Sequence, residues 1–152
     1  MYRSAINRTL IFLSSFFLVS FSFAEQHSVD DYTVHYNLLN SSFIEAAVAT
    51  QYGIKRSKNI GLLNISVMKK SEKNPNTGTG MAVISNIFGH GASLAGQVKS
   101  LAFKEIKEAD AIYYIATFPI NNGERLSFDL QVQPEKVGKL IPLKFKEQVF
   151  ID

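Results

Sequence analysis

The chain has 152 residues, no cysteine and a net charge of +3. Without cysteine, disulfide bridges, thiol catalysis and zinc-thiolate sites are excluded, and a hydrophobic core has to stabilise the fold by itself. Two of the basic residues, Arg3 and Arg8, lie in an apolar leader, and the remaining 14 basic and 13 acidic residues leave a charge of only +1. This balance gives no electrostatic reason to bind a polyanion, so we expect no nucleic-acid partner.

Residues 1–24 have the composition of a cleavable secretory signal peptide. Two arginines precede an apolar stretch from Leu10 to Val19, acidic residues are absent, and the segment ends in Ser22-Phe23-Ala24. A membrane anchor is the alternative, but serines interrupt the apolar stretch, which is shorter than the ~20 residues that span a bilayer. We therefore predict cleavage after Ala24, a single exported domain over residues 25–152, and no transmembrane segment in the mature chain.

The first predicted elements are a strand, a helix and a second strand. Residues 32–38 alternate between apolar and polar, as in a strand with one face in the core. Ser42-Phe43-Ile44-Glu45 matches the capping box that begins a helix, and Gly53 is placed to end that helix. Leu63, Ile65 and Val67 predict the next strand, which leads into a polar loop over residues 69–80.

The second half of the chain predicts strands separated by turns. The expected strands cover residues 81–88, 98–106, 111–118, 126–132 and 140–151. Gly89-His90-Gly91 is predicted to separate the first two, Asn122-Gly123 fits a tight hairpin turn, and Pro134 should end the fourth. The segment 111–118 is apolar on both faces, which is typical of a strand in the middle of a domain.

These elements predict an all-β fold. About seven strands follow one another with hairpin-length links, one short helix interrupts them, and βαβ alternation is absent. Antiparallel sheets of this length bury their apolar faces by packing together as a β-sandwich. A small closed barrel is the alternative.

Five segments resemble the domain of unknown function 4426 family, a group of small exported proteins from Gram-negative bacteria. They are Tyr52 to Asn59, Leu63 to Val67, Ala111 to Ala116, Phe128 to Val132 and Phe145 to Asp152. The resemblance covers nearly all of residues 25–152. It implies a periplasmic location and an immunoglobulin-like sandwich, but no activity, cofactor or catalytic residue.

A basic cluster flanks the second predicted strand. Residues 55–73 hold one acidic residue, Glu72, and six basic ones, namely Lys55, Arg56, Lys58, Lys69, Lys70 and Lys73. Such a cluster would suit an anionic surface, for example lipid headgroups, or a periplasmic protein. Its two halves should lie at opposite ends of the strand unless the loops fold back, and most charge runs are only solvated faces.

An enzyme is the alternative, built on the neighbouring carboxylates Glu105, Glu108 and Asp110. They would serve a hydrolase or a carbohydrate-acting domain, although adjacent loop carboxylates usually only face solvent. A pocket that holds two of them with raised pKa values would favour the enzyme, and a flat surface would favour a binding module. His90, between two glycines, is either a mobile ligand or base or a solvated loop histidine.

Cleavage after Ala24 would place Glu25-Gln26-His27 at the N-terminus. The α-amine, two amide nitrogens and the imidazole can close around one ion in a square plane, a geometry that selects Cu(II) or Ni(II). This N-terminal metal site is a minor alternative. The leading hypothesis is a non-enzymatic periplasmic binding or accessory module without a cofactor, because the sequence shows no convergent acid, base and nucleophile.

Overall fold

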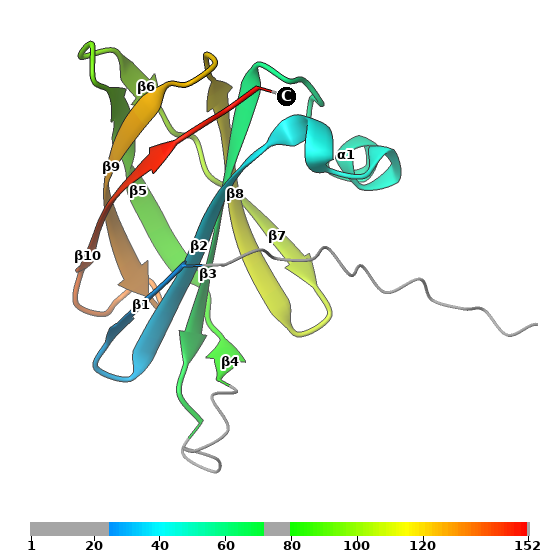
Figure 1. Cartoon of the computed structure of the whole chain (residues 1–152). Coiled ribbons are helices and arrows are strands. Elements are labelled where there is room, and N and C mark those ends of the chain that lie inside the picture. Colours follow the sequence, from blue (N-terminus) through cyan, green and yellow to red (C-terminus); the bar gives the residue numbers. More distant parts are fainter. Residues whose placement is uncertain (1–24, 72–79, 152) are drawn as a thin grey trace, which may run out of the picture.

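Two antiparallel β-sheets pack face to face in the computed structural model, which describes residues 25–71 and 80–151 (Figure 1). Sheet A has the order β1-β2-β3-β8-β7, with β4 beside β3, and sheet B has the order β10-β9-β5-β6. Sheet A contains β1 (Glu25–Val29), β2 (Tyr32–Asn40), β3 (Ile60–Lys69), β4 (Met81–Ala82), β7 (Lys104–Glu108) and β8 (Ala111–Pro119). Sheet B contains β5 (Ser85–Ser93), β6 (Val98–Ser100), β9 (Arg125–Pro134) and β10 (Ile141–Gln148). The predicted all-β sandwich is confirmed.

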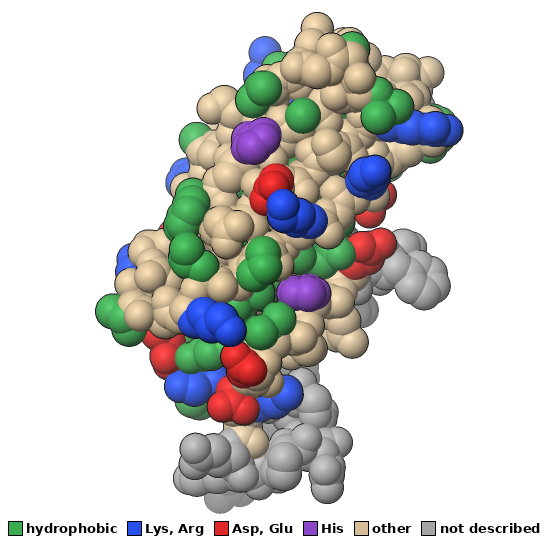
Figure 2. Space-filling model, turned by 90° about the vertical axis from the view of Figure 1, so that its left-hand side faces the viewer, with side chains coloured by type: hydrophobic (Ala, Val, Ile, Leu, Met, Phe, Trp, Pro, Cys, Tyr) green, Lys and Arg blue, Asp and Glu red, His purple; other side chains and the backbone are tan. Residues whose placement is uncertain are grey.

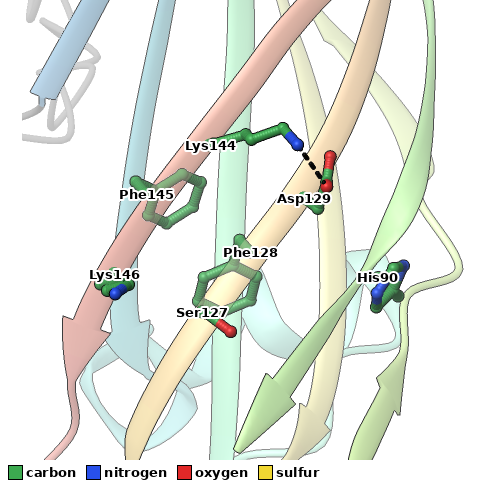
Figure 3. Close-up of a pocket in the computed structure, with 7 residues that line it drawn as sticks. All are labelled: His90, Ser127, Phe128, Asp129, Lys144, Phe145 and Lys146. Atoms are coloured by element: carbon green, nitrogen blue, oxygen red, sulfur yellow. Dashed lines mark ion pairs between the residues drawn. The ribbon is translucent and has the colours of Figure 1, made fainter.

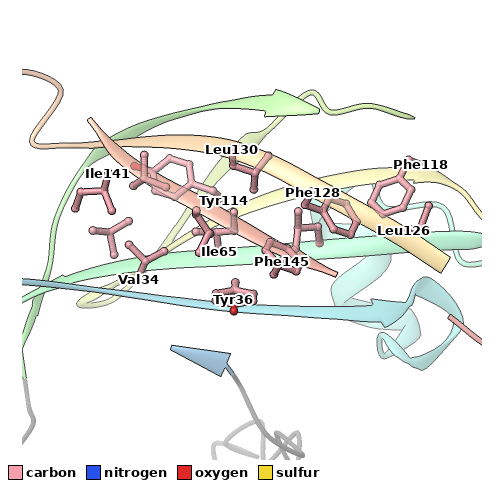
Figure 4. Close-up of a cluster of buried hydrophobic side chains, with 14 of the residues drawn as sticks. Val34, Tyr36, Ile65, Tyr114, Phe118, Leu126, Phe128, Leu130, Ile141 and Phe145 are labelled. Atoms are coloured by element: carbon pink, nitrogen blue, oxygen red, sulfur yellow. The ribbon is translucent and has the colours of Figure 1, made fainter. Parts of the chain in front are cut away.

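The core fills the space between the sheets with alternate side chains from each strand (Figure 4). In β9 every second residue from Leu126 to Val132 is buried, as the sequence alternation predicts. Aromatic rings form a chain across the core: Phe145 lies 4.4 Å from Tyr36 and 4.7 Å from Phe128, whose ring is 5.8 Å from that of Phe118. These centroid distances are in the favourable range for aromatic pairs, so the chain couples the two sheets.

The predicted short helix is present, but the capping box is wrong. A 3-10 turn, η1 (Ser41–Phe43), comes first, and α1 (Ala46–Tyr52) follows without a side-chain cap from Glu45. Ser42 does not cap α1, because its hydroxyl donates to the Asn40 side chain, which caps η1 instead. Gly53 ends α1 with a φ of 65°, as predicted.

Helix α1 lies on the side of sheet A that faces away from sheet B (Figure 1). Lys104 of β7 donates a 2.7 Å hydrogen bond to the Tyr52 carbonyl, which ties the helix to this sheet. Ala49, Leu62 and Ile106 are buried although they do not belong to the central core. Buried apolar side chains therefore also lie outside the central core.

Gly89-His90-Gly91 lies inside β5 and does not separate two strands, so that prediction is wrong. The register pairs these residues with Leu130, Asp129 and Phe128 of β9 without a break. A Cβ on Gly89 would lie 2.2 Å from the Asp129 carbonyl oxygen, and Gly89 has a φ of 139°. The glycines here permit a close approach of β9 rather than a turn. His90 therefore stands on a strand and not on a mobile loop.

The strand predicted over residues 98–106 is two strands that belong to different sheets. Val98–Ser100 pairs with β5 in sheet B, whereas Lys104–Glu108 pairs with β8 in sheet A. With the short strands β1 and β4, which lack a clear apolar alternation, the described residues form ten strands rather than about seven. The chain crosses from sheet B to sheet A within residues 101–103, and the residue types there do not predict a break in the strand.

Candidate functional site

The outer face of sheet B has no helix over it (Figure 1) and is the face turned to the viewer in Figure 2. The residues of β9 that alternate with its buried ones are all polar from Ser127 to Gln133. Charged, histidine and apolar side chains lie interspersed on this face (Figure 2). Sheet B thus presents a solvent-exposed surface that its own sequence pattern keeps polar.

A shallow hollow of about 370 Å³ lies on this face (Figure 3). Its lining residues are His90, Ser127, Phe128, Asp129, Lys144, Phe145 and Lys146. The two phenylalanines are core residues with at most 9% exposure, so they contribute mainly backbone to the wall. We call this site the Ser127 hollow, because the short serine side chain stands among longer ones.

Two cross-strand rows build the Ser127 hollow. Asp129 is paired with His90 on one side and Lys144 on the other, and Ser127 is paired with Ala92 and Lys146 in the next row. The Lys144 ammonium lies 2.8 Å from the Asp129 carboxylate, with 66% and 45% of these side chains exposed. Such an exposed ion pair contributes at most about 1 kcal/mol, so Asp129 holds Lys144 only weakly. The Ser127 hydroxyl donates to the Ala92 carbonyl (3.3 Å) rather than to His90.

The structure separates the two halves of the predicted basic cluster. Lys55, Arg56 and Lys58 lie between α1 and β3, whereas Lys69 and Lys70 lie at the far end of β3. The ten residues of β3 place the two ends roughly 30 Å apart at ~3.3 Å per residue. Lys73 lies outside the described residues. The described members therefore do not form one continuous patch.

Several members of this cluster already have partners within the fold. The Lys69 ammonium lies 2.9 Å from the Glu135 carboxylate, and its hydrogen bond, followed by that of Tyr32, lowers the pKa of Glu135. Lys70 donates to the Asp30 carbonyl, and Arg56 donates to the Ser42 carbonyl. These cations fasten loops to the sandwich.

Glu25, Gln26 and His27 form the start of β1, an exposed edge strand that pairs with β2. Gln26 lies opposite His35, and His27 lies opposite Val34. The described part of the chain holds no group of three or more His, Asp or Glu side chains placed to bind a metal ion. Chelation by this segment would therefore depend on backbone nitrogens and a new amino terminus.

The three carboxylates of the enzyme alternative do not converge. Glu105 lines a second hollow, of about 430 Å³, where it lies 3.1 Å from the Lys107 ammonium and accepts a hydrogen bond from the Tyr114 hydroxyl. Lys107, and then Tyr114, lower the pKa of Glu105. Glu108 accepts a hydrogen bond from Tyr52 of α1, and three residues of strand place it on the other face from Glu105. Asp110 lines neither of the two hollows.

Sequence reasoning missed Ser127, Asp129, Lys144 and Lys146 as a group. Each was correctly placed in a predicted strand, and their alternation with buried residues indicates that they face outward. The register that brings them side by side is not readable from one sequence. The available signal in the sequence was the presence of outward-facing lysines on a predicted strand next to another strand with outward-facing polar residues.

Together, these features define an antiparallel β-sandwich with a short helix on one outer side and an open, polar and hollowed face on the other. The chain belongs to the DUF4426 family: the model of this domain of unknown function matches residues 26–152, which confirms the resemblance seen in the sequence. No curated protein matches the chain. None of the helices in the described ranges is long and apolar enough to cross a membrane.

Solved structures share the whole fold. A DUF4426 family protein (PA0388) from Pseudomonas aeruginosa PAO1 is 33% identical, with a TM-score of 0.71 over 84% of this chain and 95% of its own. FetP from uropathogenic Escherichia coli strain F11, expressed recombinantly in the E. coli periplasm, is 13% identical, with a TM-score of 0.60 over 84% and 93%. A copper-bound FetP variant is 12% identical, with a TM-score of 0.56 over 82% and 93%. The similarity to FetP shows a common fold.

Proposed function

We propose that this protein is a non-enzymatic binding module of the periplasm that holds an anionic group of its ligand in the Ser127 hollow. The observation that carries the proposal is the row geometry, which brings Lys144 and Lys146 to one side of a hollow around the small Ser127. Among the described ion pairs, Asp129 engages Lys144, whereas Lys146 takes part in none. A ligand carboxylate or phosphate would supply the counter-charge.

The periplasmic location rests on the leader and on the relatives. Residues 1–24 match a cleavable signal peptide in composition, and the fold neighbour FetP was expressed in a periplasm. The described residues contain no cysteine, so their fold does not depend on whether the compartment is oxidising or reducing. The leader lies outside the described residues, so intact mass of the exported protein is the measurement that decides the cut after Ala24.

A binding role is favoured over catalysis by what surrounds the candidate groups. Glu105 is the one predicted catalytic carboxylate that lines a described hollow, and its pKa is lowered, whereas a general acid needs a raised pKa. Ser127 donates to a backbone carbonyl and so lacks the hydrogen bond to a histidine that activates a nucleophile. The described hollows therefore offer contact surfaces rather than an activated group.

Calorimetric titration of residues 25–152 with citrate and with inorganic phosphate, at constant ionic strength, tests the proposal. We expect Lys146→Glu to weaken binding about tenfold or more, because it reverses the charge that faces the hollow. Lys139→Glu is the matched control, since it makes the same change of net charge on an exposed loop residue. Equal losses for both variants would show that only the overall charge matters.

A second candidate function is Cu(II) or Ni(II) binding by Glu25-Gln26-His27 after cleavage. All three residues are exposed on an edge strand, so they can leave β2 without opening the core. Amide nitrogens that bind the ion cannot stay in the sheet, and Cu(II) should therefore release β1 from β2. A visible absorption band of a square-planar nitrogen site is expected, and survival of this band in His27→Ala would refute the site.

A further inference from the structure

We infer that the free edge of β5 accepts an extended segment of a partner polypeptide as an added strand. Strand β5 pairs with β9 along its whole length, but β6 covers only His90, Gly91 and Ala92 on the other side. Residues 85–89 therefore have a β9 partner on one edge and, among the described strands, none on the opposite edge. This site differs from the Ser127 hollow and does not depend on the anion proposal.

Two hydrogen bonds fix which backbone groups of β5 point toward this edge. The Ser93 N–H donates to the Gln97 carbonyl just before β6, and the Ser85 N–H donates to the Tyr114 hydroxyl of sheet A. Both residues therefore direct their N–H groups away from β9. Because backbone directions alternate along a strand, Ile87 and Gly89 direct their N–H and C=O groups to the same side. These groups, about 7 Å apart along the strand, form the hydrogen-bonding template for a new strand.

A hollow of about 430 Å³ adjoins the free edge and can take side chains of the added strand. Its lining residues are Ser85, Asn86, Ile87, Phe88, Phe103, Glu105, Tyr114 and Lys136. Ile87 and Phe103 are half-buried against the core, whereas Phe88 is 47% exposed on the outer side. Apolar surface thus lies on both sides of the backbone template.

Other edges of the sandwich carry features that discourage strand addition. Charged residues, proline and short length are the usual protections. They occur in β7 as Lys104, Glu105, Lys107 and Glu108, in β10 as Pro142, Lys144 and Lys146, in β6 as a length of only three residues, and in β1 as a length of five residues that begins with Glu25. The segment 85–89 has neither a charge nor a proline. The β5 edge is therefore the unprotected template beside a hollow.

The geometry defines the partner as an extended segment with an apolar residue at every second position. The residue opposite Ile87 would point inward toward Phe103, and its neighbour would point outward beside Phe88. Main-chain bonds to Ile87 and Gly89 would supply affinity for any extended backbone, and the hollow would select the inward side chains. A membrane lipid or a free anion offers no such backbone.

Amide hydrogen exchange and NMR titration with a capped hexapeptide of alternating valine and threonine test this inference. We expect exchange of the Ile87 and Gly89 amides to slow about tenfold or more at saturating peptide, while other exposed strand amides are unchanged. A second peptide with proline in place of each valine keeps apolar side chains but lacks alternate N–H groups, and it should not protect these amides.

Two protein variants test the hollow and the edge separately, and a third variant is a control. Phe88→Ala should weaken peptide binding about tenfold, whereas Phe43→Ala, which truncates another exposed phenylalanine far from β5 in sequence, should not change it. Ile87→Pro removes one N–H of the template and should abolish protection of the Gly89 amide. If this variant does not fold, the loss of peptide binding in Phe88→Ala is the deciding measurement. Absence of protection up to millimolar peptide, or protection at β1 instead, would overturn the inference. Slow exchange of both amides without peptide, in a dimer, would assign the edge to a second copy and equally overturn it.

Discussion

The two outer faces of the sandwich differ in what covers them. On sheet A, Leu62 and Ile106 point away from the core and are buried on the side where α1 lies. On sheet B, the corresponding positions of β9 and β10 are serine, aspartate, glutamine, lysine and one proline, and no helix lies over them. Sheet A therefore uses its outer face for stability, whereas sheet B can expose and change its outer face at little cost to the fold.

The largest effect should separate the two faces of β9. Phe128→Asp buries an unpaired carboxylate inside the aromatic chain, which costs several kcal/mol out of a total stability of ~5–15 kcal/mol, and the domain should unfold. Gln131→Asp places the same charge on the open face and should leave the melting temperature within a few degrees. Thermal unfolding by circular dichroism measures both variants, and equal stability would show that the inward and outward residues of β9 are assigned wrongly.

A smaller contrast concerns two ion pairs formed by lysines of sheet B. Lys99 and Glu124 lie 3.0 Å apart with 9% and 8% of their side chains exposed, whereas Lys144 and Asp129 are mostly exposed. Lys99→Met leaves the Glu124 carboxylate buried without its cation and should cost about 3–5 kcal/mol. Lys144→Met should cost less than about 1 kcal/mol. Urea unfolding compares the two, and similar losses would contradict the distinction between the inner and outer faces.

The smallest expected change in stability concerns Glu147 of β10, which lies near Glu25 of β1. Burial, and then the negative charge of Glu25, raise the pKa of Glu147. A raised folded-state pKa favours folding at pH values below the ordinary glutamate pKa of ~4.3, and this contribution is lost as the pH rises through the folded-state value. Glu147→Gln should therefore stabilise the domain at pH 7, by at most about 1 kcal/mol because solvent screens the site, and should have no effect near pH 3.5. Glu45→Gln on the exposed helix start is the control, and a gain that persists at pH 3.5 would rule out ionisation as the cause.

Most of the fold could be predicted because most of its strands alternate regularly between apolar and polar residues, and one is apolar on both faces. The predicted segments 32–38, 63–67, 111–118 and 126–132 all lie within strands of the structure. Strand β1 was not predicted, because Glu25–Val29 has no apolar alternation and forms a strand by pairing with β2. The glycines of Gly89-His90-Gly91 suggested a turn. They are needed instead because β9 approaches closely at this point, and this contact depends on tertiary structure.

The candidate site was harder to predict than the fold. The sequence draws attention to Lys55 and Lys69 because they are close along the chain, but a ten-residue strand holds them apart. Lys146 and Ser127 are 19 positions apart and become neighbours only through the register of β9 and β10. A single sequence gives the outward direction of each side chain but not the partner across the strand.

The most direct test of the central claim is an amide chemical-shift map of residues 25–152 titrated with citrate at constant ionic strength. The binding role assigned to the open face predicts that the largest shifts lie at Ser127, Asp129, Lys144 and Lys146 of β9 and β10, with small shifts on α1. Largest shifts in the loop that carries Lys55, Arg56 and Lys58 would contradict it, because that result would place the anion at the first half of the basic cluster instead of on the open face of sheet B.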